Sequence, residues 1–378
     1  MSRKPGVAIA EYFAPLKDPR VERTKQHLLR DILVIAICAV ICGADSWVEV
    51  EAFGNAKRKW LRRFLRLPNG IPSHDTFGRV FARLEPAQFQ ECFLAWVQAI
   101  SQLTQGQVVA VDGKTLRRSH DRTLGKSAIH MVSAWATANR LVLGQVKVDE
   151  KSNEITAIPE LLRVLELEGC IVTIDALGCQ KDIAQTIVER GGDYVLAVKE
   201  NQGQLYQDLK DLFAGYQEAH FRNVPHDYHR TVNKGHGRIE IRQCWALADS
   251  DSLNYLRQRQ DWAQLRTLVM VIAERRLGTQ TTRETRYYIA SIENNAKLAL
   301  YAARGHWRIE NELHWVLDVA FREDDSRVRK DHAPHNFAVL RHIALNLLKQ
   351  ETTERLGIKA KRLKAGWDEA YLLKILLN

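Results

Sequence analysis

VVAVDGK at residues 108–114 and CIVTIDALG at residues 170–178 each begin with a short, apolar, β-branched run. In each stretch an aspartate directly follows this run. Such runs predict buried strands. Around them the pattern predicts a hairpin from 129–137 and 141–149, a helix at 154–169, a helix at 181–192 and a further strand at 193–202. The two aspartates, Asp112 and Asp175, are therefore predicted to stand at strand ends.

The order strand, hairpin, helix, strand, helix, strand is typical of an RNase H-like core, an α/β fold with a mixed five-stranded sheet and flanking helices. In that order the first and fourth strands are neighbours. We therefore expect Asp112 and Asp175 to lie close together. Paired carboxylates that converge from different parts of the chain suit metal-dependent phosphoryl transfer.

The chain divides into four zones by pattern. Residues 1–104 predict a small helical, DNA-binding domain, with Ser46 and Ser73 as helix N-caps and a long helix from 47 to 67. Residues 105–204 form the first part of the core. Residues 205–295 predict a mostly β insertion, and residues 296–378 complete the core and add C-terminal helices.

The composition favours a polyanionic partner. The 378 residues carry a formal net charge of +10, with 26% charged and 46% hydrophobic residues. Lys and Arg in excess displace counterions from phosphates, so double-stranded DNA is the expected partner. The six cysteines have no zinc-binding spacing and predict reduced thiols. No signal-peptide pattern or membrane-length apolar run is present, so we expect a cytoplasmic, nucleoid-associated protein.

A third carboxylate is expected in HWRIENELHW, residues 306–315. His306, Glu310 and His314 share one helix face at a spacing of four, and Glu310 borders the apolar stripe of this helix. Glu312 should lie nearer solvent. The alternatives to Glu310 are Glu312, Glu323, Asp324 and Asp325. We expect packing or a carbonyl hydrogen bond for the two histidines rather than metal binding.

Polar residues at five places, all but one of them basic, are candidate DNA contacts. The run KRKWLRRFLR predicts a helix laid on phosphates, although a solvated basic face is the usual outcome for such a run. The helix after Ser73 could enter the major groove. The stretch after Asp112 could equally be an Asp-Gly turn with a solvated basic tail. The candidates are Lys57, Arg58, Lys59, Arg62, Arg63, Arg79, Lys114, Arg117, Arg118, Lys199, Asn201 and Arg238.

VDGKTLRRS, TIDALGCQ, YVLAVKENQ, HGRIEIR, HWRIENELHWVLDVAFREDDSRVR and NFAVLRHIALNLLK together resemble bacterial insertion-sequence transposases of the H-repeat-associated, ISAs-type branch, in the DDE superfamily. The resemblance covers nearly the whole chain. It implies cleavage and strand transfer of DNA at the terminal repeats of an element, with two Mg²⁺ or Mn²⁺ ions. Asp112, Asp175 and Glu310 match the catalytic and metal-binding triad of that family.

The resemblance also has a departure. Related transposases carry a Tyr, an Arg and a Lys around the glutamate, and the corresponding residues here are Ala303, His306 and Leu317. The phosphate contacts of those groups would then fall to His306 and Arg308. A homodimer on DNA is expected by resemblance. The alternative function is a catalytically inactive relic or a DNA-binding regulator of the element.

Overall fold

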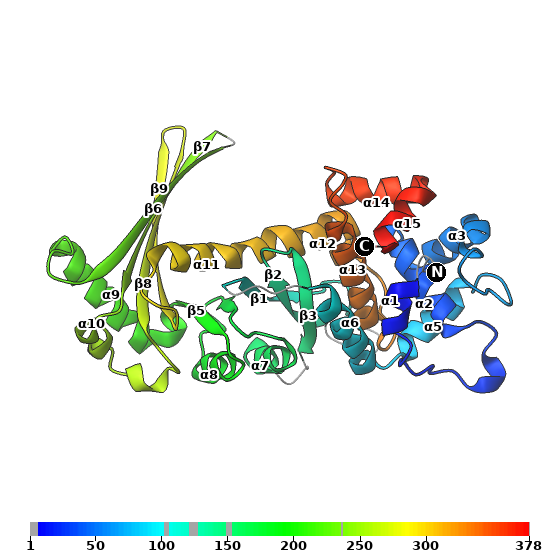
Figure 1. Cartoon of the computed structure of the whole chain (residues 1–378), viewed down its shortest axis with the longest axis horizontal. Coiled ribbons are helices and arrows are strands. Elements are labelled where there is room, and N and C mark those ends of the chain that lie inside the picture. Colours follow the sequence, from blue (N-terminus) through cyan, green and yellow to red (C-terminus); the bar gives the residue numbers. More distant parts are fainter. Residues whose placement is uncertain (1–6, 102–105, 121–127, 149–152, 236, 378) are drawn as a thin grey trace.

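One nine-stranded mixed sheet runs through the molecule, in the strand order β3-β2-β1-β4-β5-β9-β8-β7-β6. The computed structural model describes residues 7–101, 106–120, 128–148, 153–235 and 237–377. Figure 1 shows an elongated molecule with helices at one end and long strands at the other. The strands are β1 (Val108–Thr115), β2 (His130–Ala136), β3 (Leu141–Val148), β4 (Ile171–Ile174), β5 (Asp193–Val198), β6 (His226–Gly235), β7 (Arg238–Leu247), β8 (Thr267–Leu277) and β9 (Gln280–Ala290).

The first five strands have the predicted arrangement. β1 pairs antiparallel with β2, which pairs antiparallel with β3, and β1 pairs in parallel with β4, which pairs in parallel with β5. The first and fourth strands are therefore neighbours, as expected. Val111 pairs with Ile174, so Asp112 and Asp175 directly follow residues that lie opposite each other.

Asp112 lies inside its strand, so the prediction that it stands at the strand end is wrong, and the alternative of an Asp-Gly turn is excluded. β1 continues to Thr115, and Asp112 and Gly113 pair with Ser133 and Val132 of β2. Gly113 leaves room for the side chain of Glu154, because a Cβ at this position would lie 2.3 Å from Glu154 Oε1. The hairpin partner β2 thus holds the Asp112 backbone on one side.

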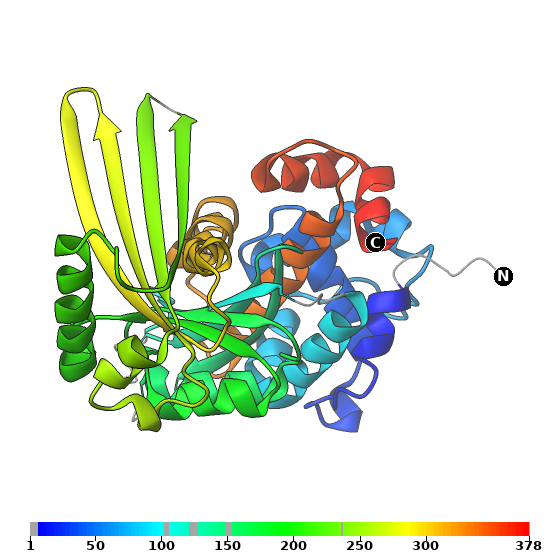
Figure 2. The ribbon, with the colours of Figure 1, turned by 60° about the vertical axis from the view of Figure 1, so that its left-hand side comes forward.

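The predicted β insertion extends the same sheet. β9 pairs antiparallel with β5, since Val195 lies opposite Ala290 and Val198 opposite Tyr287. Two helices accompany its strands, α9 (Gly203–Glu218) and α10 (Ser250–Tyr255). The far halves of β6–β9 extend beyond the helices as a four-stranded projection, which we call the arm (Figures 1 and 2).

Helices cover the two faces of the sheet. α7 (Glu154–Val164) and α8 (Lys181–Glu189) pack on one face, and α11 (Ala296–Ile309) crosses the other, from the arm strands to β1. Figure 2 shows α11 nearly end-on beside the strands. Gly305 allows its close approach, because a Cβ there would lie 2.7 Å from Val108 Cγ1. α11 therefore ends directly above β1.

The N-terminal helices are α1 (Val7–Tyr12), α2 (Leu29–Ile41), α3 (Trp47–Ala56), α4 (Arg58–Leu61), α5 (His74–Arg83) and α6 (Pro86–Ile100). Both predicted N-caps are confirmed, because Ser46 accepts from the Glu49 amide and Ser73 from the Thr76 amide. The single long helix expected from 47 to 67 is wrong. It breaks at Lys57, and the basic run falls on the short α4 and the turns beside it.

The C-terminal helices join the N-terminal ones in a common core. They are α12 (Trp315–Phe321), α13 (Ala333–Gln350), α14 (Ile358–Trp367) and α15 (Glu369–Leu377), and α13 packs against α2, α5 and α6. The Asn336 amide donates to the carbonyls of Phe81 and Leu84 at 2.8 and 3.0 Å. The expected domain boundary at 104/105 lies outside the described residues. Among the described helices, none is both long enough and apolar enough to span a bilayer.

Candidate active site

Sheet alternation brings Asp112 to the face of β1 that α11 covers. Side chains alternate between the two faces of a strand, and Val108, of the same parity as Asp112, packs in the apolar cluster of α11 with Ile171 of β4. Glu310 follows the last residue of α11. Asp112 and Glu310 thus meet where the helix ends over β1.

The residues after α11 form a π-helical turn, Glu310–His314, before α12 begins. Wide turns of this kind occur often at functional sites. The turn keeps Glu310 and His314 on one side, with His314 Nδ1 lying 3.7 Å from Glu310 Oε2 and 3.4 Å from Asp112 Oδ2. One ligand atom from each of these three residues lies within 4.8 Å of the others.

Charge crowding shifts the pKa values of these carboxyls. Burial, together with the negative charges of Glu310 and Asp175, raises the pKa of Asp112 to about 8. The interaction of Glu310 with the imidazole of His314 lowers the pKa of Glu310. The repulsion between the carboxylates indicates a site that a cation would stabilise.

Asp175 stands at the end of β4 and accepts a hydrogen bond from the Gly178 amide at 3.2 Å. It therefore also stabilises the turn that leads to α8. Its charge reaches both Asp112 and His306. The structure thus brings Asp112 and Glu310 together and places Asp175 near enough for its charge to act on Asp112, although no ligand atom of Asp175 belongs to the group that Asp112, Glu310 and His314 form.

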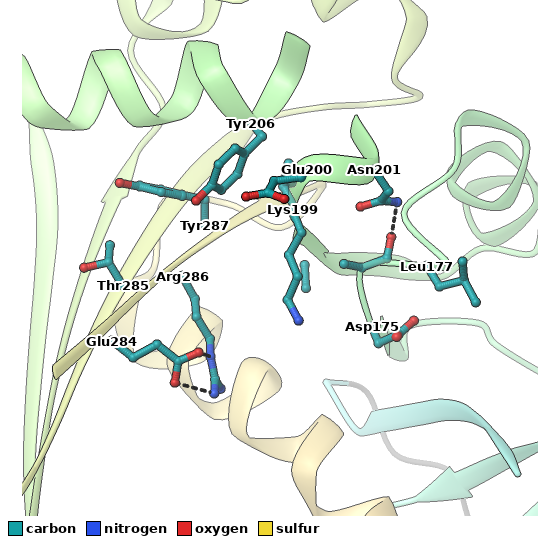
Figure 3. Close-up of a pocket in the computed structure, with 13 residues that line it drawn as sticks. Asp175, Leu177, Lys199, Glu200, Asn201, Tyr206, Glu284, Thr285, Arg286 and Tyr287 are labelled. Carbon is teal, nitrogen blue, oxygen red and sulfur yellow. Dashed lines mark hydrogen bonds and ion pairs between the residues drawn. The ribbon is translucent and has the colours of Figure 1, made fainter. Parts of the chain in front are cut away.

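A cavity of about 590 Å³ opens beside Asp175 (Figure 3). Lys199 extends into it, and Asn201 donates to the Ala176 carbonyl at 2.6 Å, which ties the loop after β5 to the loop that carries Asp175. On the opposite wall, Arg286 of β9 pairs with Glu284 at 2.6 Å. The lining of the cavity therefore carries two cations, Lys199 and Arg286, and three carboxylates, Asp175, Glu200 and Glu284.

Arg286 also stacks on a tryptophan from α11. Its guanidinium lies 4.5 Å from the centre of the Trp307 ring, and nearly half of the Trp307 surface is exposed. This contact fixes the base of the arm against α11.

The alternative third carboxylates are engaged elsewhere. Glu312 pairs with Arg308 at 2.9 Å and with Arg140 at 3.8 Å. The expectation that Glu312 lies nearer solvent than Glu310 is wrong, since the Glu312 side chain is 24% exposed and that of Glu310 is 54% exposed. Glu323 is buried, and Asp324 and Asp325 face the basic stretch after β1.

The candidate phosphate ligands after Asp112 all face acidic partners. Lys114 pairs with Asp318 and with Glu323, the latter at 2.9 Å. Arg117 lies 3.3 Å from Asp324, and Arg118 lies 3.4 Å from Asp325. The sequence shows the basic run and the acidic run separately and gives no sign that they pair. Their pairing leaves Lys114 little free charge for DNA.

His306 lies one turn before Glu310, and burial lowers its pKa. Its Nδ1 has no hydrogen-bond partner among the described residues. Arg308 donates to Glu312, one turn farther along the chain, at 2.9 Å. Of the two, His306 is the one whose electrostatic partners include Asp175 and Glu310.

The N-terminal basic residues belong to α4, to the turns beside it and to α5, and α5 lies at the helical end of the molecule (Figure 1). Trp60 and Phe64, which interleave with them, pack edge to face at 4.8 Å, with Trp60 in the core and Phe64 partly buried against it. Lys57 pairs with Glu369 at 3.3 Å. The exposed members are Arg58, Lys59, Arg62, Arg63 and, on α5, Arg79.

Arg238 lies at the far end of the arm, on the same face as α11. It shares this face with Arg242 and Arg275, because residues opposite each other in the register point the same way. Glu240 lies between the first two and pairs with both, at 2.9 Å from Arg238. Arg304 of α11 also faces the group. Burial is the main cause that lowers the pKa of Arg304, and the positive charges of Arg242 and Arg308 add to it.

Comparison with known proteins identifies the family of the chain. Residues 103–347 match the family described as Transposase DDE domain, and residues 10–97 match the associated family DDE_Tnp_1-associated. The H repeat-associated putative transposase YhhI of Escherichia coli (strain K12) is 41% identical over 97% of this chain and 97% of its own length. The putative transposase YncI of Escherichia coli O157:H7 is 40% identical over 98% of this chain and 95% of its own.

A solved structure also aligns along the chain. The cryo-EM structure of a piggyBac transposase synaptic complex with hairpin DNA has a TM-score of 0.43 and 10% identity, over 99% of this chain and 82% of that one. A similarity of this size does not define a shared fold. The family match and the sequence relatives do establish the family. The chain belongs to the DDE-domain transposases, among the bacterial insertion-sequence members.

Proposed function

We propose that this chain cuts DNA at the ends of its own insertion sequence and joins those ends to target DNA, in a reaction that needs a divalent metal. Asp112, Asp175 and Glu310 would form its catalytic triad. The observation that supports the proposal is that Asp112 of β1 and Glu310 after α11 bring carboxylate oxygens within 4.8 Å of each other, while Asp175, directly after β4, acts on Asp112 through its charge. Convergence of this kind suits phosphoryl transfer.

The strand order β3-β2-β1-β4-β5 supports an RNase H-like catalytic core. We infer that residues 105–204 and 296–378 make up this core, that residues 205–295 are an insertion whose strands continue its sheet, and that residues 1–104 bind DNA. Within such a core the carboxylates have rigid supports. Asp112 lies in a strand paired on both sides, and Glu310 continues a helix packed on that strand.

The three carboxylates fit a divalent ion, because carboxylate oxygens suit both Mg²⁺ and Mn²⁺. Their mutual repulsion, which raises the pKa of Asp112, points the same way. We expect Asp112, Asp175 and Glu310 to hold two such ions. The chemistry that the ions supply is stabilisation of the attacking and leaving oxygens.

The protein itself would supply positioning and charge. A water molecule and then a DNA 3′-hydroxyl would be the nucleophiles, so that no covalent protein–DNA intermediate forms. Lys199, which extends into the cavity beside Asp175, suits a phosphate of the strand being cut. Asn201 would act indirectly, because it holds the loop that carries Asp175.

We propose two DNA-contact surfaces outside the triad. One is the exposed basic group Arg58, Lys59, Arg62, Arg63 and Arg79 at the helical end. The other is the α11 side of the arm, with Arg238, Arg242 and Arg275. Their separation along the molecule would let one protomer hold DNA at two places, and we propose a homodimer as the form that pairs two ends.

The test uses full-length protein and labelled DNA that carries the ends of the element. With Mg²⁺ we expect nicking at the element's ends, and with EDTA or in Asp112→Asn we expect binding without nicking. Loss of DNA binding in Asp112→Asn would show that the aspartate is structural. Binding by the wild type without nicking in Mg²⁺ or Mn²⁺ would favour an inactive relic or a DNA-binding regulator of the element.

A further inference from the structure

His314 is a buried group that faces the catalytic carboxylates but has no place in the triad. Its side chain is 6% exposed, and its Nδ1 lies 3.4 Å from Asp112 Oδ2 and 3.7 Å from Glu310 Oε2. Its other ring nitrogen, Nε2, has no hydrogen-bond partner among the described residues. The ring is thus held in place by packing, with one nitrogen directed at two carboxylates.

Neither separation is that of a good hydrogen bond, for which nitrogen and oxygen lie about 2.7 to 3.2 Å apart. A buried polar group without a partner destabilises the folded state. In the arrangement of Asp112, Glu310 and His314, the imidazole therefore has one buried nitrogen, Nε2, without a partner, and its Nδ1 meets the two carboxylates only at distances longer than a good hydrogen bond.

The same separations suit three ligands of one ion. Oxygen ligands lie about 2.1 Å from Mg²⁺ in an octahedral site, so neighbouring ligands are roughly 3 Å apart and opposite ones about 4.2 Å apart. The distances of 3.4 and 3.7 Å from His314 Nδ1 fall between these limits. Nitrogen donors of imidazole commonly ligate divalent transition ions through a neutral ring.

We propose that His314 supplies a nitrogen ligand to the ion that Asp112 and Glu310 hold, so that the site favours Mn²⁺ over Mg²⁺. This inference rests on the proposed metal-dependent function. Mg²⁺ takes oxygen ligands almost exclusively, whereas transition ions accept imidazole. An Asp–Glu–His set should therefore discriminate between the two ions more strongly than three carboxylates would.

His306 provides the natural comparison within the same helix. It is also largely buried beside the site, and the charges of Asp175 and Glu310 act on it. No ligand atom of His306 belongs to the group that Asp112, Glu310 and His314 form. We therefore assign the nitrogen ligand to His314 and not to His306.

The test is pulsed electron spin resonance of the full-length protein loaded with Mn²⁺. We expect modulation of the spin echo by a coordinated nitrogen, which changes when the protein carries isotopically labelled histidine. In His314→Gln the nitrogen signal should vanish, and the Mn²⁺ dissociation constant should rise by about tenfold or more. In His306→Gln both should stay as in the wild type.

Competition with Mg²⁺ gives a second measurement. The concentration of Mg²⁺ that displaces half of the Mn²⁺ should fall by about tenfold in His314→Gln, since the lost ligand serves Mn²⁺ more than Mg²⁺. If His314→Gln does not fold, which a thermal melt would show, His314→Asn and the labelled wild type carry the same test.

Three results would overturn the inference. They are bound Mn²⁺ without nitrogen modulation, modulation that survives in the His314 variant, and modulation lost in His306→Gln instead. Failure of the proposed function is a separate result. In that case the wild type would bind no Mn²⁺ that Asp112→Asn removes, whatever the behaviour of His314.

Discussion

Lys114 Nζ lies 2.9 Å from Glu323 Oε2, and this buried ion pair joins β1 to the segment after α12, 209 residues farther along the chain. The Lys114 side chain is 13% exposed and that of Glu323 is 2% exposed. Asp318 completes the ammonium's surroundings, and Arg341 approaches Glu323 at 3.6 Å. The pair therefore fixes α12, and with it the π-helical turn that carries Glu310, against the strand that carries Asp112.

Replacing Lys114 tests this positioning role. Lys114→Met should lower the free energy of unfolding by about 3 kcal/mol, because Glu323 would stay buried with less compensation. Chemical denaturation at neutral pH measures it. Arg117→Met is the control, since Arg117 is largely exposed in its pair with Asp324, and its effect should stay below about 1 kcal/mol.

Lys114 as a phosphate ligand predicts the opposite pattern. In that case Lys114→Met would weaken DNA binding and leave the denaturation midpoint unchanged. Glu323→Gln separates the two as well, because only a structural pair makes the effects of the two substitutions non-additive.

The two faces of the arm should differ in DNA affinity. Arg238, Arg242 and Arg275 face the α11 side, and their joint replacement by Gln should weaken DNA binding and lower the salt slope by about 1 per lost phosphate contact. Titration of labelled DNA at several salt concentrations measures this.

The matched control carries three substitutions on the opposite face of the same strands. These are Arg230→Gln, Arg276→Gln and Arg283→Gln, which remove the same charge. Equal losses in the two triple variants would mean that the arm acts only through its net charge, and no loss in either would remove the arm from the proposed DNA surface.

The free energy of unfolding should decrease in acid, because the buried His342 must become protonated. Burial on α13 lowers its pKa to about 4, with Glu323, His314, Lys114 and Arg341 as the charged or titratable groups around it. The unfolded chain, with an ordinary histidine pKa near 6.5, binds a proton that the folded chain does not. Stability is thus fully present above about pH 6.5 and decreases as the pH falls toward 4, by on the order of 3 kcal/mol.

Urea denaturation at several pH values measures this effect. His342→Asn should reduce the pH slope between 6.5 and 4 by about one proton, whereas His332→Asn, at an exposed position, should leave the slope unchanged. An unchanged slope in His342→Asn would show that the imidazole is protonated in the folded protein.

The core strands were predictable because their signals are local. Residues 108–111 and 171–174 are buried apolar runs of strand length, and the hairpin and the two helices between the later strands follow from turn and cap signals. The pairing of Val195 with Ala290 was not predictable, because nothing local in either strand names a partner so far along the chain. The shared sheet therefore appears only in the structure.

The candidate site shows the same division. The three triad candidates could be predicted from the sequence. Asp112 and Asp175 follow apolar strand-like runs, Glu310 borders the apolar face of a helix, and all three match the triad of the family that the chain resembles. The spacing of four also placed His314 on the face of Glu310, but the distance to Asp112 that gives it chemical meaning depends on the packing of α11 over β1. The pairing of Lys114 with Glu323 likewise depends on the tertiary fold and is not visible in the sequence. The basic run by itself therefore predicted a DNA contact for Lys114.

The most direct test compares two carboxylates on the same turn. Glu310→Gln and Glu312→Gln remove one charge each, two residues apart, but Glu312 is held by Arg308 and Arg140 away from Asp112. Both variants would be incubated with labelled DNA that carries the element's ends, in Mg²⁺ and in EDTA.

We predict metal-dependent nicking at the element's ends by the wild type and by Glu312→Gln, and its loss by on the order of a thousandfold or more in Glu310→Gln, with DNA binding retained. Nicking that survives in Glu310→Gln would contradict the assignment of the triad. Loss in Glu312→Gln alone would move the third carboxylate to Glu312.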